Sequence, residues 1–510
     1  MPAANPTFSL VDQPEVFFTS TSTSRAIRRF VLNGEIRQIV GPMYTKNLVD
    51  PLEDVVRRRP WDAAAGYFPG AVITDRTAFE MKPVGEEGSV FLSGATRRTV
   101  RLPGLVLVCR RGPGPVEGDN PFLDGRLYLA SWGRRFLDNV RPSRARTTTR
   151  RTLTRSELED KLREVLIRQG ESGLNRIRDE AAEVADALDA HAELNELHDL
   201  IGALLGTVDV PLATPAGRAT AAGRGWDDRR IALFETLAGG LHAHITADRP
   251  ERLRHTGQAF AFYEAYFSNF IEGTEFTLEE AREIVFDRVI PEQRPADGHD
   301  VAGTFDLVVD PASRGLVPND AVDLDRIIRS FHARIMAGRP DVGSGHFKQK
   351  ANRAGNTEFV DPTLVDGTLD RAWELYASLP AGFARAVFAL FLVAEVHPFA
   401  DGNGRVARAL ANAELTASGQ QRLIVPTVFR DDYLQALRAL SRDALVDPLL
   451  KVAERAQAWT FEVDWSSLAA AKVDLDATHA LLESYEADAR GVILRLPSEL
   501  PARGRRGGAA

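Results

Sequence analysis

The chain has 510 residues with 63 Lys and Arg against 71 Asp and Glu, a formal net charge of −8, and its apolar fraction of 44% excludes a disordered chain. Its one cysteine excludes a disulfide framework and any metal site built from several thiolates. The most apolar run, Phe383 to Val396, is shorter than the roughly 20 residues that span a bilayer, and the first residues do not follow the pattern of a signal peptide. We therefore expect a cytoplasmic protein that does not associate with membranes.

The charge is distributed unevenly along the chain. Residues 1–150 carry 22 basic and 15 acidic side chains, or +7, which leaves −15 for residues 151–510. This difference predicts two regions with different electrostatic tasks. The length suggests about three domains at roughly 150 residues each.

The first 140 residues predict a mixed α/β module. A Ser/Thr run at 20–24 supplies N-cap candidates for a helix over 25–32, and two short strands follow within 35–44 around a Gly-Pro turn. A helix followed by a hairpin is typical of the end of a winged helix, so we interpret 1–50 as winged-helix-like. Residues 51–140 alternate β-rich runs with Gly and Pro turns, which predicts a small α/β domain.

The rest of the chain is predicted to be mainly helical. Residues 150–205 form a helical connector whose partly heptad-like apolar stripe is compatible with a homodimer, although packing within the chain is favoured. Residues 206–225, rich in Gly, Ala, Thr and Pro, predict a linker. A helical segment follows over 226–315, with a loop-rich part from Pro291 to Pro318, then a core over 316–465, and a C-terminal helix with a disordered tail over 466–510.

The most informative stretch is His-Pro-Phe-Ala-Asp-Gly-Asn-Gly-Arg-Val-Ala-Arg, residues 397–408. The apolar run before it predicts a buried helix that ends at His397, and a new helix is expected to start near Gly404. A glycine-rich loop that opens into a helix N-terminus beside two arginines is suited to bind a polyphosphate. Asp401 offers the hard oxygen that Mg²⁺ prefers next to phosphates, and His397 has the ordinary pKa of a general base.

These twelve residues resemble the defining motif of the Fic (filamentation induced by cAMP) domain family, H-P-F-x-[D/E]-G-N-G-R-x-x-R, at every specified position. The resemblance implies a mainly α-helical domain with a β-hairpin flap. It also implies transfer of a nucleoside monophosphate, usually AMP from ATP, to a Ser, Thr or Tyr hydroxyl of a protein, which can be the enzyme itself. His397 would be the catalytic base and Asp401 would hold Mg²⁺ or Mn²⁺. The implied nucleotide-binding residues are Asp401, Gly402, Asn403, Gly404, Arg405 and Arg408.

A second stretch, Ser268 to Gly273, is similar to the family's inhibitory motif [S/T]-x-x-x-E-[G/N]. It lies in an aromatic-rich helical pattern N-terminal to the core, which resembles the class II arrangement of the family. The resemblance implies that Ser268, Glu272 and Gly273 are inhibitory and that Glu272 pairs with Arg408, which keeps Arg408 from the γ-phosphate.

The segment 345–362 occupies the place of the family's target-docking flap, with a hairpin turn at 354–356. The commoner pattern has Arg where Phe347 and Lys348 stand, so this sequence departs from it. An extended substrate segment could add a strand along such a hairpin. The candidate flap residues are Asn352, Ala354, Gly355, Asn356, Thr357 and Glu358.

Residues of about 20–115 more weakly resemble the winged-helix region of AbiEi-type antitoxins, which bind DNA. The resemblance implies phosphate contacts from Arg25, Arg28 and Arg29. The sequence therefore leaves an alternative open. The chain could be a DNA-binding, antitoxin-like transcriptional regulator whose Fic domain acts as a sensor or a silenced toxin.

Overall fold

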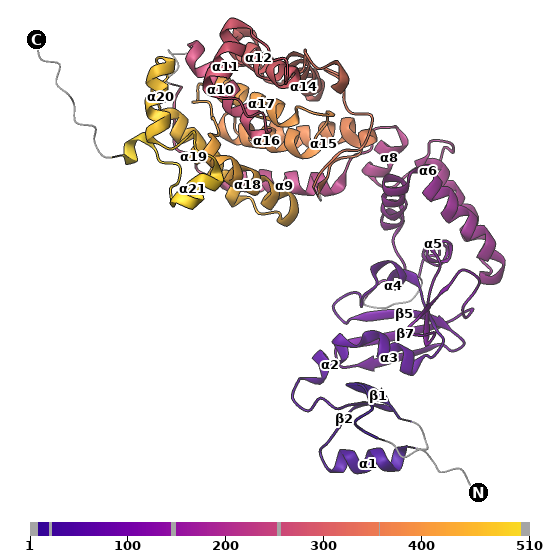
Figure 1. Ribbon diagram of the computed structural model, residues 1–510. Helices are drawn as coiled ribbons and strands as arrows, with labels where there is room; N and C mark the ends of the chain where they lie inside the picture. The colour runs from indigo at the N-terminus through magenta and orange to yellow at the C-terminus, as the bar shows by residue number, and fades with distance from the viewer. Residues whose placement is uncertain (1–8, 20–22, 144–148, 252–256, 356, 501–510) are drawn as a thin grey trace, which may run out of the picture. The chain divides into compact units, whose positions relative to one another are not determined.

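The computed structural model describes residues 9–19, 23–143, 149–251, 257–355 and 357–500. The chain divides into two compact units, Met1–Ala222 and Gly223–Ala510, drawn in indigo to magenta and in magenta to yellow in Figure 1. Residues 20–22 of the predicted N-cap run, Asn356 of the predicted flap and the predicted tail from 501 onward lie outside the described residues. The mixed α/β first unit and the helical second unit confirm the predicted fold class at this coarse level.

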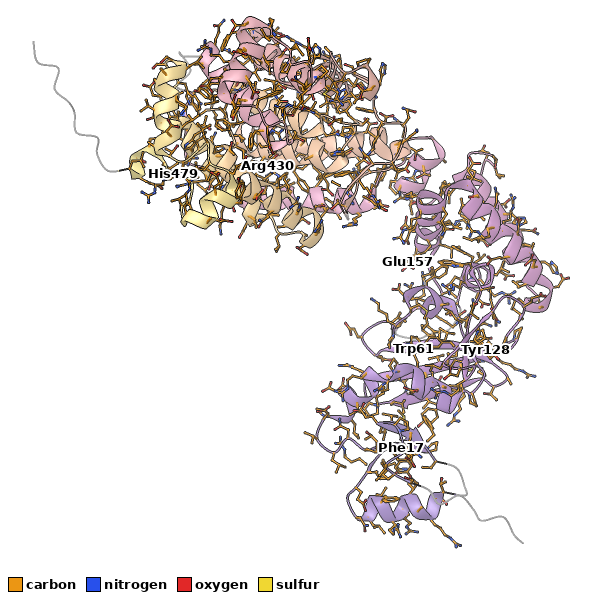
Figure 2. The ribbon with its side chains drawn as sticks, in the orientation of Figure 1. Phe17, Trp61, Tyr128, Glu157, Arg430 and His479 are labelled. Carbon is orange, nitrogen blue, oxygen red and sulfur yellow. The ribbon has the colours of Figure 1, made fainter. Side chains whose placement is uncertain are left out.

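The N-terminal unit begins with a small antiparallel sheet and one helix. The elements are β1 (Val16–Phe18), α1 (Ser24–Leu32), β2 (Arg37–Val40) and β3 (Met43–Thr45), and the strands lie in the order β1-β3-β2. Phe17, Ile27 and Ile36 form its apolar core, and Phe17 is labelled in Figure 2. The helix and the hairpin lie where the sequence predicts them. That this module is a winged helix stays a prediction.

A larger mixed sheet follows, in the strand order β6-β7-β5-β4-β9-β8. Its pairs β5–β7 and β4–β9 are parallel and the others are antiparallel. Figure 1 shows α2 and α3 on one side of the sheet and α4 on the other. The elements are α2 (Leu52–Arg58), α3 (Pro60–Tyr67), β4 (Val72–Ile73), α4 (Asp75–Glu80), β5 (Ser89–Gly94), β6 (Arg98–Leu102), β7 (Leu105–Arg111), β8 (Asn120–Phe122), β9 (Leu127–Leu129) and α5 (Trp132–Val140).

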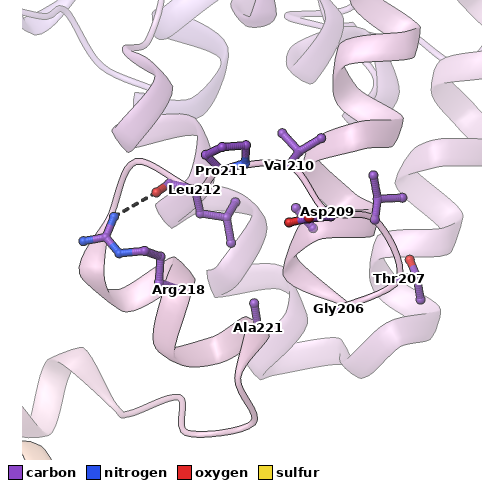
Figure 3. A pocket seen from close by; sticks show the side chains of 10 residues that line it. Gly206, Thr207, Asp209, Val210, Pro211, Leu212, Arg218 and Ala221 are labelled. Atoms are coloured by element: carbon purple, nitrogen blue, oxygen red, sulfur yellow. Dashed lines mark hydrogen bonds between the residues drawn. The ribbon is translucent and has the colours of Figure 1, made fainter.

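The first unit ends in the helices α6 (Arg155–Leu188), α7 (His191–Leu204) and α8 (Pro215–Ala221). Helix α8 lies inside 206–225, which the sequence predicts as a linker. Thr214 caps α8 through its side chain, Pro215 stands in its first turn, and Leu212 and Ala216 are buried, so the segment is folded rather than extended. Beside α8 lies a hollow of about 500 Å³ in which Arg218 Nη1 donates to the carbonyl of Leu212 at 2.8 Å (Figure 3).

The second unit is helical around the buried helix α16. The elements up to the motif are α9 (Asp228–Ala243), α10 (Gln258–Ile271), α11 (Leu278–Arg282), η1 (Glu283–Asp287), α12 (Pro295–Val309), α13 (Pro311–Arg314), α14 (Ala321–Ile335), η2 (Pro340–Val342), β10 (Arg353–Ala354), β11 (Thr357–Glu358), η3 (Pro362–Leu364), α15 (Val365–Ser378) and α16 (Phe383–Val396). The elements after it are α17 (Asn403–Ala417), η4 (Thr427–Phe429), α18 (Arg430–Asp443), α19 (Asp447–Glu462), α20 (Leu468–Ala477), α21 (Ser484–Arg490) and η5 (Pro497–Glu499).

One segment of this unit differs from the prediction. Residues 291–318, expected to be rich in loops, contain the helices α12 and α13. Each begins with a proline in its first turn, where the missing N–H has no partner to lose. Val301, Phe305 and Val308 lie on the buried side of α12 and join the aromatic core of α10. The prolines are therefore helix starts, not breaks.

Candidate active site

Helix α16 holds His397 at its C-terminal end. Most of its side chains are buried, and His397 caps it with a left-handed backbone (φ +52°). Nδ1 of His397 lies 3.2 Å from the carbonyl oxygen of Ala394. A carbonyl only accepts, so Nδ1 carries the proton and Nε2 keeps a free lone pair. One ring face stacks on Phe359 at a centroid distance of 3.7 Å. Burial lowers the pKa of His397 to about 4, so the imidazole is neutral at pH 7.

The loop after His397 is closed by the side chain of Asn403. Its Oδ1 accepts from the Phe399 N–H at 2.8 Å and its Nδ2 donates to the Phe399 carbonyl at 2.9 Å. Gly402 has φ +77°, and a Cβ there would lie 2.9 Å from the sulfur of Met336. The polar side-chain atoms of Asn403 therefore hold the loop, and that Asn403 binds phosphate stays a prediction. The first turn of α17 contributes its backbone N–H groups, which have no partner within the helix.

The guanidinium of Arg405 donates its hydrogen bonds to side chains of the protein itself. Its Nη1 donates to Asp300 Oδ2 at 2.7 Å and to Asn269 Oδ1 at 3.0 Å, and Nη2 reaches Asp401 Oδ1 at 3.4 Å. The side chain of Arg405 is 3% exposed and that of Asp300 is 2% exposed. This buried pair joins α12 to α17, so the guanidinium of Arg405 orients the loop instead of pointing into the cavity.

Asp401 is the one carboxylate of the motif, and its side chain is 43% exposed. Its Oδ1 accepts from the Gly402 N–H at 2.6 Å, and Oδ2 lies 3.4 Å from Arg339 Nη2. One exposed carboxylate beside a helix N-terminus fits Mg²⁺, which takes few protein ligands and shares its shell with phosphates and water. Within the described residues, no group of three or more His, Cys, Asp or Glu could hold a metal by itself.

The sequence-predicted inhibitory residues meet the motif at Arg408. Arg408 Nη2 donates to Glu272 Oε1 at 2.7 Å and to the Ser268 carbonyl at 2.7 Å, and Nε donates to Ser268 Oγ at 3.0 Å. Burial raises the pKa of Glu272, but the positive charges of Arg408 and Arg405 more than offset this and hold it below its ordinary value. Glu272 is therefore ionised and paired with the arginine that the sequence predicts.

Two backbone features fix this carboxylate. Glu272 caps the C-terminus of α10, and Arg430, labelled in Figure 2, donates from Nε to the carbonyl of the preceding Ile271 at 3.1 Å. Gly273 then leaves the helix with φ +88°. Across the gap, a Cβ on Gly404 would collide with Glu272 Oε1. The absence of a side chain at Gly404 is what lets Glu272 lie over the start of α17.

His397, Gly404, Arg408 and Glu272 line one cavity of about 420 Å³, whereas Asp401, Asn403 and Arg405 are not among its lining residues. Phe391, Leu434 and Leu437 give the same cavity an apolar part. The size and the change from a cationic to an apolar lining suit a ligand with a charged and a flat apolar part.

The hairpin β10–β11 forms the remaining wall, with Arg353 opposite Glu358 and Ala354 opposite Thr357. Ala354, Gly355 and Thr357 line the cavity, and Asn352 Nδ2 anchors the hairpin base to the Phe399 carbonyl at 3.0 Å. The hairpin therefore lies beside His397. That it docks a target stays a prediction.

Several residues that sequence reasoning missed hold this site. His332 donates from Nε2 to the Asp401 carbonyl at 3.1 Å, stacks on Phe399 at 3.9 Å, and accepts from the Gly345 N–H at 2.8 Å. Asp300 lies in the segment that was predicted to be a loop. The helical spacing of Val301, Phe305 and Val308 could have indicated the helix that carries it. No motif marks His332.

Comparison with known proteins supports the motif. The sequence profile of the Fic/DOC family matches residues 322–415. The chain is 26% identical over 229 residues to the protein adenylyltransferase Fic of Drosophila willistoni and 26% identical over 237 residues to that of Drosophila mojavensis. Each alignment covers 44% of this chain and 45% of the relative, so the match spans less than half of either protein.

One solved structure that the second unit resembles is that of a Fic domain containing signaling protein from Bacteroides thetaiotaomicron. The two chains are 18% identical and superpose with a TM-score of 0.35. The match covers 97% of that chain and 48% of this one. Among the described helices none is long and apolar enough to cross a membrane. Residues 322–415, which hold His397 and the helix that follows it, are a Fic/DOC family domain, as the motif predicts.

Proposed function

We propose that this chain is a Fic-type protein nucleotidyltransferase that moves AMP from ATP to a Ser, Thr or Tyr hydroxyl and is restrained by its own Glu272. The observation that carries the proposal is the cavity of about 420 Å³ in which the free Nε2 of His397, the N-terminus of α17 and Arg408 come together. The names of the relatives, protein adenylyltransferase Fic, support AMP as the transferred group and a protein as the acceptor.

The proposed reaction exchanges one P–O bond for another. Nε2 of His397 accepts the proton of the target hydroxyl, whose oxygen attacks the α-phosphorus of ATP while the bond to pyrophosphate breaks. Asp401 would hold Mg²⁺ or Mn²⁺, which supplies positive charge to the phosphate oxygens. The N–H groups in the first turn of α17 donate to the phosphates, and this positioning provides most of the rate acceleration.

The restraint acts on Arg408. Glu272 Oε1 lies 2.7 Å from Arg408 Nη2, so the carboxylate compensates the positive charge of Arg408 and holds its guanidinium against α10. Arg408 is then not free to bind a γ-phosphate. A charge-assisted hydrogen bond contributes about 1.5 to 3 kcal/mol, which corresponds to about tenfold to a hundredfold in an equilibrium.

The test compares intact masses after incubation with ATP and Mg²⁺. We expect Glu272→Gly to gain AMP on itself or on an added protein at least about tenfold faster than the wild type, and Glu272→Gly with His397→Ala to gain none. Glu275→Gly, the same change at an exposed glutamate three residues on, is the control and should behave as the wild type. Transfer that persists without His397, or no gain in Glu272→Gly, contradicts the proposal.

A second candidate function, DNA binding by the N-terminal module, is favoured by one surface. Arg25, Arg28 and Arg29 of α1 are exposed, and among the described residues none of them has a carboxylate partner. A gel-shift titration across salt concentrations tests it, because affinity from phosphate contacts falls steeply with salt. Arg28→Ala with Arg29→Ala should weaken binding, whereas Arg57→Ala, which removes an arginine already paired with Glu53, should not. Equal loss in both variants would argue against α1 as the contact.

A further inference from the structure

A buried ion pair lies behind the hairpin, outside the motif. Arg230, near the start of α9, places Nε 2.7 Å from Glu395 Oε1, and the two side chains are 4% and 5% exposed. This is a charge contact, because the Nε–H itself has no acceptor in line with it. Ser441 of α18 adds a hydrogen bond to the same carboxylate oxygen at 3.0 Å. Glu395 is two residues before His397 on the rigid helix α16.

The same arginine holds the hairpin. Nη2 of Arg230 donates to the backbone carbonyl of Glu358 on β11. The neighbouring Arg442 donates from Nη2 to Thr357 Oγ1 at 3.3 Å, but its side chain is exposed. Arg230 is thus the buried link between a short, exposed strand and the core of the unit.

The held carbonyl belongs to the residue directly before Phe359. The Phe359 ring stacks on the His397 imidazole with an interplanar angle of 5° at 3.7 Å, and its N–H donates to the Asn352 carbonyl at 3.2 Å. A two-residue strand has few hydrogen bonds of its own, so its position depends on what anchors it. Arg230 and the Asn352 carbonyl thus hold the two polar atoms of the same peptide group, the one that joins Glu358 to Phe359.

Stability alone does not explain the arrangement. A buried ion pair loses hydration that its attraction barely offsets, so replacing it with apolar groups often leaves stability unchanged. What an apolar pair cannot supply is a directed N–H for the Glu358 carbonyl. The planar guanidinium reaches the carboxylate and the carbonyl with donors that are fixed in one plane and spread over three nitrogens, whereas a lysine ammonium carries its donors on one nitrogen at the end of a flexible stem.

We propose that Arg230 is a positioning residue for the nucleotidyl transfer: paired with Glu395, it holds β11 so that Phe359 lies flat on His397. The imidazole then keeps one orientation, with Nδ1 on the Ala394 carbonyl and Nε2 toward the cavity. The role in catalysis rests on the proposed function, whereas the link from Arg230 to the ring stack is a property of the free protein and can be measured without any reaction.

The experiment uses the full chain with Glu272→Gly and selectively labelled histidines. The ring current of Phe359 should shift the His397 ring-proton NMR signals upfield, and Phe359→Leu gives their unstacked position. His397→Asn identifies these signals among the 10 histidines. We expect Arg230→Lys to move them toward the Phe359→Leu position and to slow AMP transfer by about tenfold to a hundredfold, the usual effect of a misplaced catalytic group.

Two further variants keep the test decisive. Arg422→Lys changes another buried Arg–Glu pair of the same unit, with Glu264, and serves as the matched control. Its melting temperature should fall about as much as in Arg230→Lys, with the His397 signals unmoved. Arg230→Met with Glu395→Leu removes the pair without leaving a buried charge, and should also unstack the rings.

The results separate the two proposals. His397 signals that stay in place in both Arg230 variants, or that move equally in Arg422→Lys, overturn the positioning role. Signals that move while no variant transfers AMP leave the link standing and remove the proposed function instead. Signals that move without any change in the transfer rate overturn the catalytic part of the inference.

Discussion

Arg405 is a residue whose chemistry and whose contacts point to different tasks. A motif arginine at a helix N-terminus suits phosphate, yet its guanidinium is shared among Asp300, Asn269 and Asp401. Asp300 Oδ1 has no hydrogen-bond partner among the described residues, and Oδ2 accepts from Arg405 at 2.7 Å and from Arg339 Nη1 at 3.2 Å, so removing Arg405 takes away the nearer of the two counter-charges of a buried carboxylate.

We expect Arg405→Ala to lower the free energy of unfolding by about 3 to 5 kcal/mol, as for a broken buried pair. Arg288→Ala, which removes an exposed pair with Asp306, should cost less than about 1 kcal/mol. Urea denaturation monitored by circular dichroism measures both. Equal costs would mean that Arg405 is not a structural residue and is free for ligand.

His332 makes stability depend on pH. Burial lowers its pKa to about 4, and its Nδ1 accepts from the Gly345 N–H, which only the neutral ring can do. Between pH 6.5 and 4 the unfolded chain therefore binds a proton that the folded chain excludes, so stability is lost as the pH falls. We expect a drop of about 3 kcal/mol from this residue, so His332→Gln should lose about 3 kcal/mol less than the wild type between pH 7 and pH 4 in urea titrations, while His397, whose pKa is lowered likewise, contributes to the drop in both proteins. A drop of the same size in His332→Gln would assign the effect to other groups.

At the residue scale, the sequence could predict the groups that the motif names but not the ones that hold them. His397, Gly404 and Arg408 line one cavity, and Glu272 reaches Arg408 from 136 residues away as the resemblance implies. Asp300, His332 and Arg230 could not be predicted, because their roles depend on contacts between segments whose packing no local pattern encodes.

At the scale of elements, the close approach of α12 and α14 sets the position of Asp300 and His332. A Cβ on Gly303 of α12 would lie 2.5 Å from the Ile335 carbonyl oxygen and 2.8 Å from that of Arg334. The backbones therefore touch at a position where only glycine fits, and α14 presents His332 toward the loop after α16.

We expect Gly303→Ala to destabilise the chain by about 1 to 3 kcal/mol, because the helices must separate. Gly239 in α9 is the matched control, since a Cβ there meets nothing within 4 Å. Gly239→Ala should stabilise by about 0.5 to 1 kcal/mol through helix propensity alone. Thermal unfolding of both variants decides, and two stabilising changes would contradict the close packing.

Helices were predicted correctly where the apolar residues form a continuous pattern. They were missed where the segment is rich in proline and glycine. Helix α16 has the bounds that its apolar run predicts, and α17 begins one residue before the predicted glycine. Helices α8 and α12 were taken for linker and loop because Pro and Gly are common in both segments. A proline in the first turn starts a helix as readily as one in the middle breaks it, so composition alone could not separate the two.

For the whole molecule, the boundary between the two units at Ala222 changes how the net charge is divided along the chain. The N-terminal unit, Met1–Ala222, carries 30 basic and 29 acidic residues, or +1, and Gly223–Ala510 carries −9. The acidic helices α6 and α7 belong with the basic module and offset it. The predicted positive region is thus one end of a nearly neutral unit, and a DNA contact would depend on α1 rather than on the charge of the unit.

The division at Ala222 also predicts that the chain can be separated there. Each unit has its own apolar clusters, and every residue of the proposed transfer site lies beyond Gly223. We expect residues 223–510 with Glu272→Gly to fold alone and to transfer AMP to themselves within about threefold of the full chain, since a domain with its own core keeps its site. Intact-mass measurement of both forms checks this, and a matched cut at Arg249, between α9 and α10, should abolish folding because it separates Arg230 from the rest of the unit. A folded but inactive fragment 223–510 would mean that the N-terminal unit takes part in the transfer.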